Sequence, residues 1–233
     1  MQTISITHWR TYPVIARCVP FGLFIGMLVF VSLFPPTTID GAETAVASWM
    51  VVGRGALVAL TLAWFWPSYS ELRRTAPARW MDWLLAVGVG FAVFLAWIGF
   101  DQDWAVLSRS VGFIPHDPEG ATDWLKASAR LAGFALVVPV MEELFWRSFL
   151  LRWIQRREFL AVDPGRVGAR AFLITMVLFS LEHDHWLGGA VAGASYNWLY
   201  MRSANLWVPI LAHATTNAVL GGWIMYTGNW QYW

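Results

Sequence analysis

Long runs of apolar residues, separated by short polar connections, follow one another along almost the whole chain. A helix needs about 20 apolar residues to cross the hydrocarbon core of a bilayer. Seven segments approach this length, and the short fifth and sixth adjoin at residues 183–185. The pattern predicts an all-α, polytopic membrane helical bundle of about seven transmembrane helices, with room for an eighth, re-entrant element. The expected spans are residues 13–34, 49–69, 80–100, 124–151, 169–184, 186–201 and 205–226.

Basic residues are concentrated in every second connection between the apolar segments. Arg10 precedes the first segment, and arginines gather in the second, fourth and sixth connections. The first connection instead contains Asp40 and Glu43, and the third is mainly acidic. Lys and Arg are enriched in cytoplasmic loops. Seven spans place every basic connection on one side, so we expect a cytoplasmic N-terminus and take the first segment as an uncleaved membrane helix.

Composition agrees with this picture. Hydrophobic residues make up 58% of the 233 residues and charged residues only 13%, whereas soluble domains have about a quarter charged residues. We therefore expect a single integral membrane domain over residues 1–233. The net charge of +1 predicts no nucleic-acid partner. A single cysteine, Cys18, excludes an internal disulfide and a CxxC pair.

Three groups of polar residues interrupt the apolar segments of the second half of the chain. An ionisable residue in the middle of a membrane costs at least about 2.5–3.5 kcal/mol and therefore usually marks function. Because the three groups fall in successive parts of one half of the chain, they predict a shared chemical site. They are Glu142, Glu143 and Arg147; Glu182, His183, Asp184 and His185; and His213 and Asn217.

Helix geometry sorts these side chains. Glu143 and Arg147 are four residues apart, so they share a helix face and can pair. Glu142 points about 100° away from that pair and is left free to exchange protons, as a general base must. His213 and Asn217 share a face for the same reason. Pro139, just before the glutamates, is expected to kink the helix beside the site.

Each group also has a structural explanation. Glu143 and Arg147 alone would serve as a helix-stabilising ion pair, and a single buried histidine such as His213 is more often a packing residue. Glu182, near a membrane edge, is expected to be solvated. Arg54 in the second segment is expected to reach the outer interface with its long side chain and is not assigned to the site.

Several kinds of protease chemistry compete for these residues. A rhomboid-like serine site is weakly supported, because the sequence around Ser195 lacks the last glycine of GxSG. A zinc protease would show HExxH on one helix, and the chain has no such motif. No aspartate pair lies in mid-span. Zinc binding by Glu142, His183 and His213 stays open, since two histidines and a glutamate form a known catalytic zinc set.

In their order and spacing, the three groups resemble the motifs EExxxR, FxxxH and HxxxN/D of the CAAX protease and bacteriocin-processing (CPBP) family of intramembrane endopeptidases. The matching residues are Glu142-Glu143-xxx-Arg147, Phe179-xxx-His183 and His213-xxx-Asn217. The resemblance covers a CPBP-like core at residues 124–225. The flanking sequence further resembles the branch that accompanies bacterial exosortase and PEP-CTERM sorting systems.

The resemblance implies a role for each motif residue. Glu142 would activate a water molecule that His183 shares, and Arg147 would hold Glu143 as a structural pair. His213 and Asn217 would stabilise the tetrahedral oxyanion. His185 competes with His183, and the FxxxH spacing favours His183. The family implies no obligatory metal or other cofactor, although zinc is left open.

We therefore expect an intramembrane glutamate-type endopeptidase of the bacterial inner membrane. Its substrate would be a membrane-associated or lipid-linked protein or peptide, and its further partners membrane lipid and an exosortase or PEP-CTERM system. The eukaryotic prenylated substrate does not follow from the fold. A proton-coupled transporter is an alternative, which the lack of an inverted repeat disfavours. A non-catalytic interaction or immunity protein is another.

Overall fold

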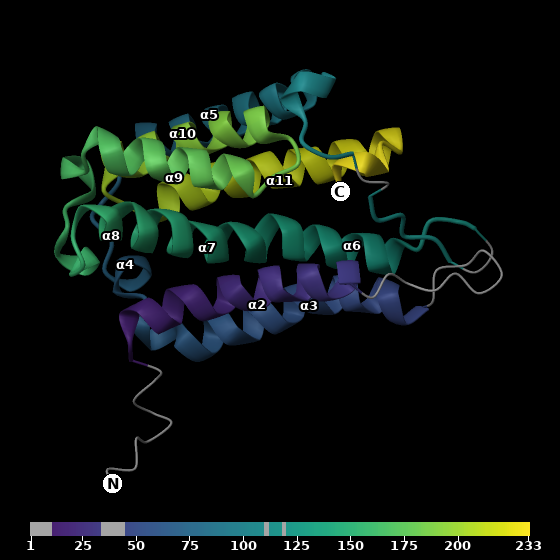
Figure 1. The fold of residues 1–233 in the computed structure, drawn as a ribbon, viewed down its shortest axis with the longest axis horizontal. Helices are drawn as coiled ribbons and strands as arrows, with labels where there is room; N and C mark the ends of the chain where they lie inside the picture. The colour runs from purple at the N-terminus through teal and green to yellow at the C-terminus, as the bar shows by residue number, and fades with distance from the viewer. Residues whose placement is uncertain (1–10, 34–44, 110–111, 118–119) are drawn as a thin grey trace, which may run out of the picture. The chain divides into compact units, whose positions relative to one another are not determined.

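The computed structural model describes residues 11–33, 45–109, 112–117 and 120–233, and this part of the chain is helical apart from its connections (Figure 1). One isolated antiparallel bridge, between His116 and Thr122, is the extended pairing found there. The all-α prediction is therefore confirmed. The principal helices are α2 (Pro13–Leu33), α3 (Ala45–Phe65), α5 (Trp80–Gly99), α6 (Trp124–Ala132), α7 (Val138–Glu143), α8 (Leu151–Gln155), α9 (Ala169–Leu181), α10 (Trp186–Ser203) and α11 (Trp207–Thr227).

These helices begin and end within about one turn of the segments expected from the apolar pattern. By length and composition, Pro13–Val31 and Trp80–Gly99 are the helices of the described chain that are long and apolar enough to cross a membrane. The count of seven spans and the orientation remain predictions. Arg10, Asp40 and Glu43, on which the orientation partly depends, lie outside the described residues.

Local capping explains where two of the helices begin. The Asp123 side chain accepts hydrogen bonds from the backbone N–H groups of Leu125 and Lys126, at 3.1 and 3.0 Å, and so caps the N-terminus of α6. At the start of α5, the Asp82 carboxylate accepts from the backbone N–H of Arg79 at 3.1 Å. In both cases a carboxylate satisfies amides that have no partner inside the helix.

Residues 124–155 form one helical run with two π-helical segments, Gly133–Val137 and Leu144–Leu150, on either side of α7. In each, a backbone N–H reaches the carbonyl five residues earlier: Val138 to Gly133, and Leu151 to Trp146. Such wide turns occur often at functional sites. The first ends just before Pro139, which has no N–H to donate. A wide turn thus precedes the proline, and the kink expected at Pro139 stays a prediction.

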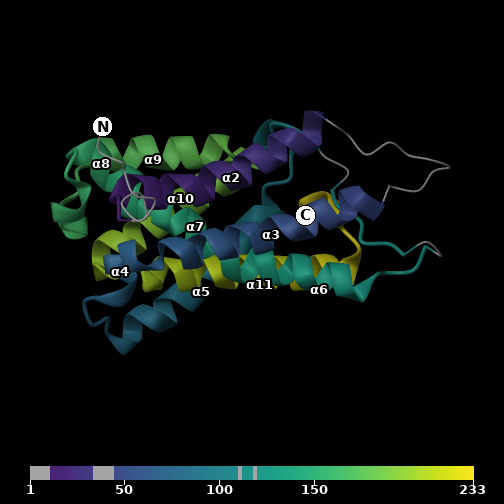
Figure 2. The same ribbon diagram turned by 90° about the horizontal axis from the view of Figure 1, so that it is seen from below.

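The helices group into two compact units. The first comprises residues 1–69, 111–141 and 221–233. Within it α2 packs along α3, as both views show (Figure 1 and Figure 2). Helix α3 also packs against α6 and the π-helical segment after it. A Cβ at Gly55 would lie 3.3 Å from the Cα of Gly133, so these two glycines let the backbones approach.

The second unit comprises residues 70–110 and 142–220. In it α10 lies between α9 and α5, with contacts to both (Figure 1). Small residues make this packing close. A Cβ at Gly193 would lie 3.2 Å from the carbonyl oxygen of Met176 in α9, and one at Gly188 would lie 3.0 Å from the Trp97 ring in α5. Helices in membranes associate through such small residues.

Helix α9 is shorter than its expected span. It has 13 residues, which rise about 20 Å at 1.5 Å per residue, whereas the hydrocarbon core is about 30 Å thick. It ends at Leu181, and Glu182, His183, Asp184 and His185 form the turn that leads into α10. The short helix explains how the histidine of the second motif can lie both at a helix end and inside the bundle.

The approach of α5 to α11 depends on Gly90. A Cβ at this position would lie 2.3 Å from the carbonyl oxygen of Ala212. We expect Gly90→Ala to lower the thermal unfolding midpoint of the detergent-solubilised protein, because the overpacking cost of about 1–3 kcal/mol exceeds the gain in helix propensity. Gly88→Ala in the same helix is the matched control, since no atom lies within 4 Å of its added Cβ. Equal midpoints for the two variants would contradict this packing.

Candidate functional site

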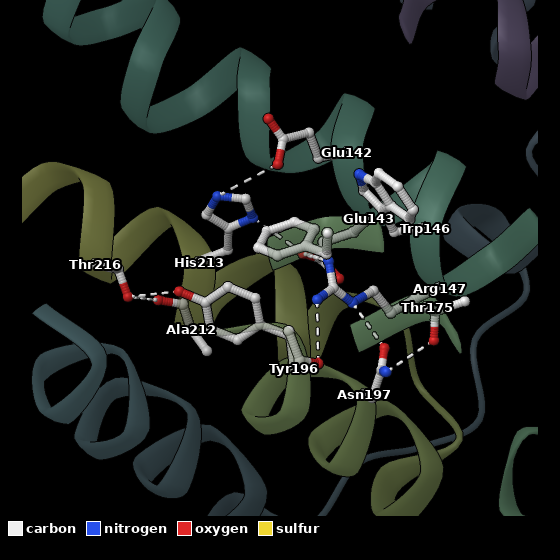
Figure 3. A network of polar contacts seen from close by, with 12 residues as sticks. Glu142, Glu143, Trp146, Arg147, Thr175, Tyr196, Asn197, Ala212, His213 and Thr216 are labelled. Carbon is white, nitrogen blue, oxygen red and sulfur yellow. Dashed lines mark hydrogen bonds and ion pairs between the residues drawn. The ribbon is translucent and has the colours of Figure 1, made fainter. Parts of the chain in front are cut away.

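A buried arginine organises the polar groups of the second unit. Arg147 is 0% exposed. Its Nη1 donates to Glu143 Oε1 at 3.0 Å, its Nε to Asn197 Oδ1 at 3.2 Å, and its Nη2 to the carbonyl of Gly193 at 3.4 Å (Figure 3). The guanidinium also lies over the Phe179 ring, 4.4 Å from its centre. The ion pair expected from the four-residue spacing is formed, and it joins its own helix to α9 and α10.

Asn197 is a member of this network that the sequence analysis did not identify. Its Nδ2 donates to Thr175 Oγ1 at 2.9 Å and to the Phe172 carbonyl at 3.2 Å. The residue is 1% exposed. An amide in the middle of an expected span was the available signal. It was missed because no charge or motif accompanied it.

His213 lies between the two adjacent glutamates. Its Nδ1 is 2.9 Å from Glu143 Oε1, and its Nε2 is 3.9 Å from Glu142 Oε2 (Figure 3). A carboxylate only accepts hydrogen bonds, so Nδ1 carries a hydrogen and donates it to Glu143. This fixes the ring with Nε2 toward Glu142, in the way that a second hydrogen bond orients a metal-binding or catalytic histidine.

The other side of the His213 ring is covered by Tyr196. The two rings stack with centres 4.9 Å apart and planes 22° apart. Thr216 Oγ1 donates to the Gly90 carbonyl at 2.8 Å, and Tyr196 Oη therefore donates to Thr216 Oγ1 at 2.7 Å. Sequence analysis did not identify Tyr196, whose role depends on the packing of α10 against α11.

Glu142 is 4% exposed, and its Oε2 has no hydrogen-bond partner among the described residues. It has no arginine partner comparable to that of Glu143, as its position on the helix predicted. The distance of 3.9 Å to His213 Nε2 is too long for a hydrogen bond, and it lets one water molecule bond to both atoms at about 2.8 Å. Glu142 is thus the carboxylate of the pair that remains available for proton transfer.

The two candidate histidines of the second motif have different surroundings. His183 Nδ1 lies 2.7 Å from the Phe179 carbonyl, which can only accept, so Nδ1 carries the hydrogen and Nε2 the lone pair. Its ring packs against Phe179 and Trp97. His185 instead lies 3.4 Å from Asp101 and stacks on Trp97. His183 therefore adjoins the Phe179 that covers Arg147, whereas His185 meets a carboxylate outside the motifs.

Asn217 follows His213 by one turn of α11 and is 6% exposed. The expectation that Glu182 is solvated is wrong. Glu182 Oε2 accepts a hydrogen bond of 3.0 Å from Trp146 Nε1, and its carboxylate is close enough to Glu142 for the two charges to repel. Glu182 directly follows the last residue of the short α9, and the site thus has a third carboxylate that sequence analysis did not assign.

Zinc binding was left open in the sequence. Among the described residues, no three side chains of His, Cys, Asp or Glu are arranged to hold one metal ion. Glu142, His183 and His213 thus do not fit a common metal ion in this arrangement.

In this site a buried carboxylate, Glu142, faces a nitrogen of the buried His213 ring across 3.9 Å. Such an arrangement is suited to the activation of water. Residues 124–219 match the family model "Rce1-like: Type II CAAX prenyl endopeptidase Rce1-like". Over this segment the chain is similar to that family of peptidases, and the match supports the predicted CPBP assignment. The members of the family are integral membrane proteins. No curated protein and no solved structure gave a match.

We expect the buried pair of Glu143 and Arg147 to have a measurable effect on stability. We expect Arg147→Met to destabilise the protein by about 3–5 kcal/mol, because it leaves Glu143 charged and buried without its partner. Glu143→Gln in the Arg147→Met background should recover part of the loss. Thermal unfolding in detergent measures both. Arg156→Gln is the control: Arg156 pairs with Glu158 on the surface, and such pairs contribute about 0–1 kcal/mol. An Arg147→Met variant as stable as this control would contradict the assignment.

Proposed function

We propose that the chain is a membrane-embedded endopeptidase in which Glu142 activates water and His213 faces the reacting carbonyl. The observation that carries the proposal is the geometry of the His213 ring. Glu143 holds one nitrogen at 2.9 Å, and the other faces Glu142 Oε2 at 3.9 Å. A water molecule between Glu142 and His213 would be held by both.

In the proposed reaction, Glu142 takes a proton from this water. The hydroxide oxygen bonds to the carbonyl carbon of the substrate, and the carbonyl oxygen becomes an oxyanion. When the carbon–nitrogen bond breaks, the proton held by Glu142 passes to the leaving amine. His183, whose Nε2 carries the lone pair, would accept a hydrogen bond from the same water.

The oxyanion would be stabilised by His213 and Asn217. A doubly protonated His213 ring donates from Nε2, and Glu143 would stabilise its positive charge. Arg147 acts through Glu143, since it holds that carboxylate against the ring. Asn217 lies one turn further along the same buried helix face and would add an amide donor. All six motif residues then have roles in one reaction.

The proposed setting is a bundle of seven spans in a bacterial inner membrane, with a cytoplasmic N-terminus. The alternation of basic and acidic connections supports it. The family implies membrane-associated protein or peptide substrates. We propose an apolar peptide or a precursor handled by an exosortase system, because the flanking sequence resembles that branch.

Cleavage should depend on the proposed residues. With an internally quenched apolar peptide, supplied with and without a farnesyl group, we expect the wild-type protein in detergent to cleave at least one form. Glu142→Gln and His213→Ala should each lower the rate at least about 100-fold, as expected for loss of a general base or an oxyanion donor. Glu158→Gln, on the exposed surface, is the matched control. Activity retained by Glu142→Gln would refute the mechanism.

A chelator added to the same assay tests the proposed metal-independent reaction. Because no three His, Cys, Asp or Glu side chains of the described residues are arranged to hold one metal ion, we expect 1,10-phenanthroline to leave the rate unchanged. Loss of activity that zinc restores would show that the reaction needs a metal after all. The apolar, non-chelating isomer 1,7-phenanthroline controls for effects of the compound on the detergent micelle.

The orientation has its own test. A C-terminal alkaline phosphatase fusion should be active in bacterial cells, because this enzyme folds only outside the cytoplasm and seven spans place the C-terminus there. A fusion to green fluorescent protein at the same residue should be dark. The reverse result would mean that the number of spans is even.

A further inference from the structure

The first unit contains a hollow that the proposed reaction does not use. It is a partly open space between α2, α3 and the helical run that begins with α6, with a volume of about 350 Å³ that includes the open mouth. Phe24, Phe134 and Val138 contribute apolar walls, and two arginines, Arg54 and Arg130, contribute charge.

Among the described residues, neither arginine has a carboxylate partner. Arg54 lies over the Phe24 ring, 4.4 Å from its centre. Arg130 lies over Phe113 and Trp233, 5.0 and 5.4 Å from the ring centres. The Arg130 Nε is buried and has no hydrogen-bond partner among the residues that the structure describes. The two guanidiniums are also close enough to repel each other.

Aromatic rings alone leave these groups unsatisfied. A cation–π contact is worth about 0.5–2 kcal/mol and uses the face of the guanidinium, so its in-plane N–H donors remain available. Two neighbouring cations in an apolar pocket also lack a counter-charge from the part of the chain that the structure describes. One anion between them would accept hydrogen bonds from both and remove the repulsion. Phosphate suits this arrangement, because the guanidinium fork matches its oxygens.

We propose that Arg54 and Arg130 bind a phosphate group in this hollow, with the apolar walls receiving the hydrocarbon part of its carrier. In the seven-span arrangement proposed above, α3 and α6 both begin on the outer side. The carrier is then a phospholipid of the outer leaflet, whose headgroup the long arginine side chains reach. The assignment of the phosphate group to a lipid depends on that seven-span arrangement, whereas the phosphate site itself does not.

The test uses the full-length protein in detergent, with thermal unfolding and native mass spectrometry as readouts. The probes are dioleoylphosphatidylglycerol, dioleoylglycerol (the same chains without phosphate) and inorganic phosphate. We expect phosphatidylglycerol to raise the unfolding midpoint by at least about 3 °C and to remain bound, and dioleoylglycerol to do neither. A comparable shift with inorganic phosphate would assign a free anion as the ligand. If neither phosphatidylglycerol nor inorganic phosphate raised the unfolding midpoint of the wild-type protein or remained bound to it, the proposal would be overturned.

Paired variants separate this site from general binding of anionic lipid. Arg54→Gln/Arg130→Gln should lose the phosphate-dependent shift and lower lipid occupancy at least fivefold. Arg54→Lys/Arg130→Lys, which keeps the charge, should retain part of both and serves if the glutamine variant fails to fold. Arg170→Gln removes one exposed arginine and should behave as wild type. Equal losses in the Arg170 and double-glutamine variants would contradict a specific site, whatever their peptidase activity.

Discussion

The guanidinium of Arg147 is the group on which the candidate site depends. A buried charge is tolerated only where its hydrogen bonds and its counter-charge are supplied, because desolvation costs several kcal/mol. Here Nε, Nη1 and Nη2 each have an acceptor, Nη1 on its own helical run and the other two on α10. The arginine thereby sets the position of Glu143. Glu143 in turn sets the orientation of His213, so one desolvated cation controls a ring on another helix.

Close helix packing makes this control possible. Glycines let α10 approach α9 and α5 at van der Waals distance, and Gly90 lets α5 approach α11. Only at such distances can short side chains such as Thr216 bond to the backbone of a neighbouring helix. Tyr196 then stacks on the His213 ring, and Thr216 holds the Tyr196 hydroxyl. The polar residues of these helices are therefore buried partners of one another, and the small residues bring them together.

The sequence anticipated much of the candidate site because its strongest signals are local. The Glu143–Arg147 pair and the separate direction of Glu142 follow from helix periodicity alone. The residues that were missed depend on other helices. Asn197 and Tyr196 owe their roles to the packing of α10, and Glu182 is half-buried because α9 ends early. Helix periodicity does not predict the structure of a connection between helices. For that reason the sequence analysis wrongly expected Glu182, which lies in such a connection, to be solvated.

By itself, the sequence determined that the protein is helical, approximately where its helices begin and end, and which residues were too polar for their surroundings. These properties follow from apolar runs, caps and residue spacing, which act within a few turns of chain. The tertiary structure alone decided that Glu143 lies between Arg147 and His213, that Glu142 Oε2 faces a histidine nitrogen across 3.9 Å, and that Arg54 and Arg130 line one hollow. The physical reason is distance along the chain: these groups come from helices far apart in sequence, and only packing brings them within reach of each other.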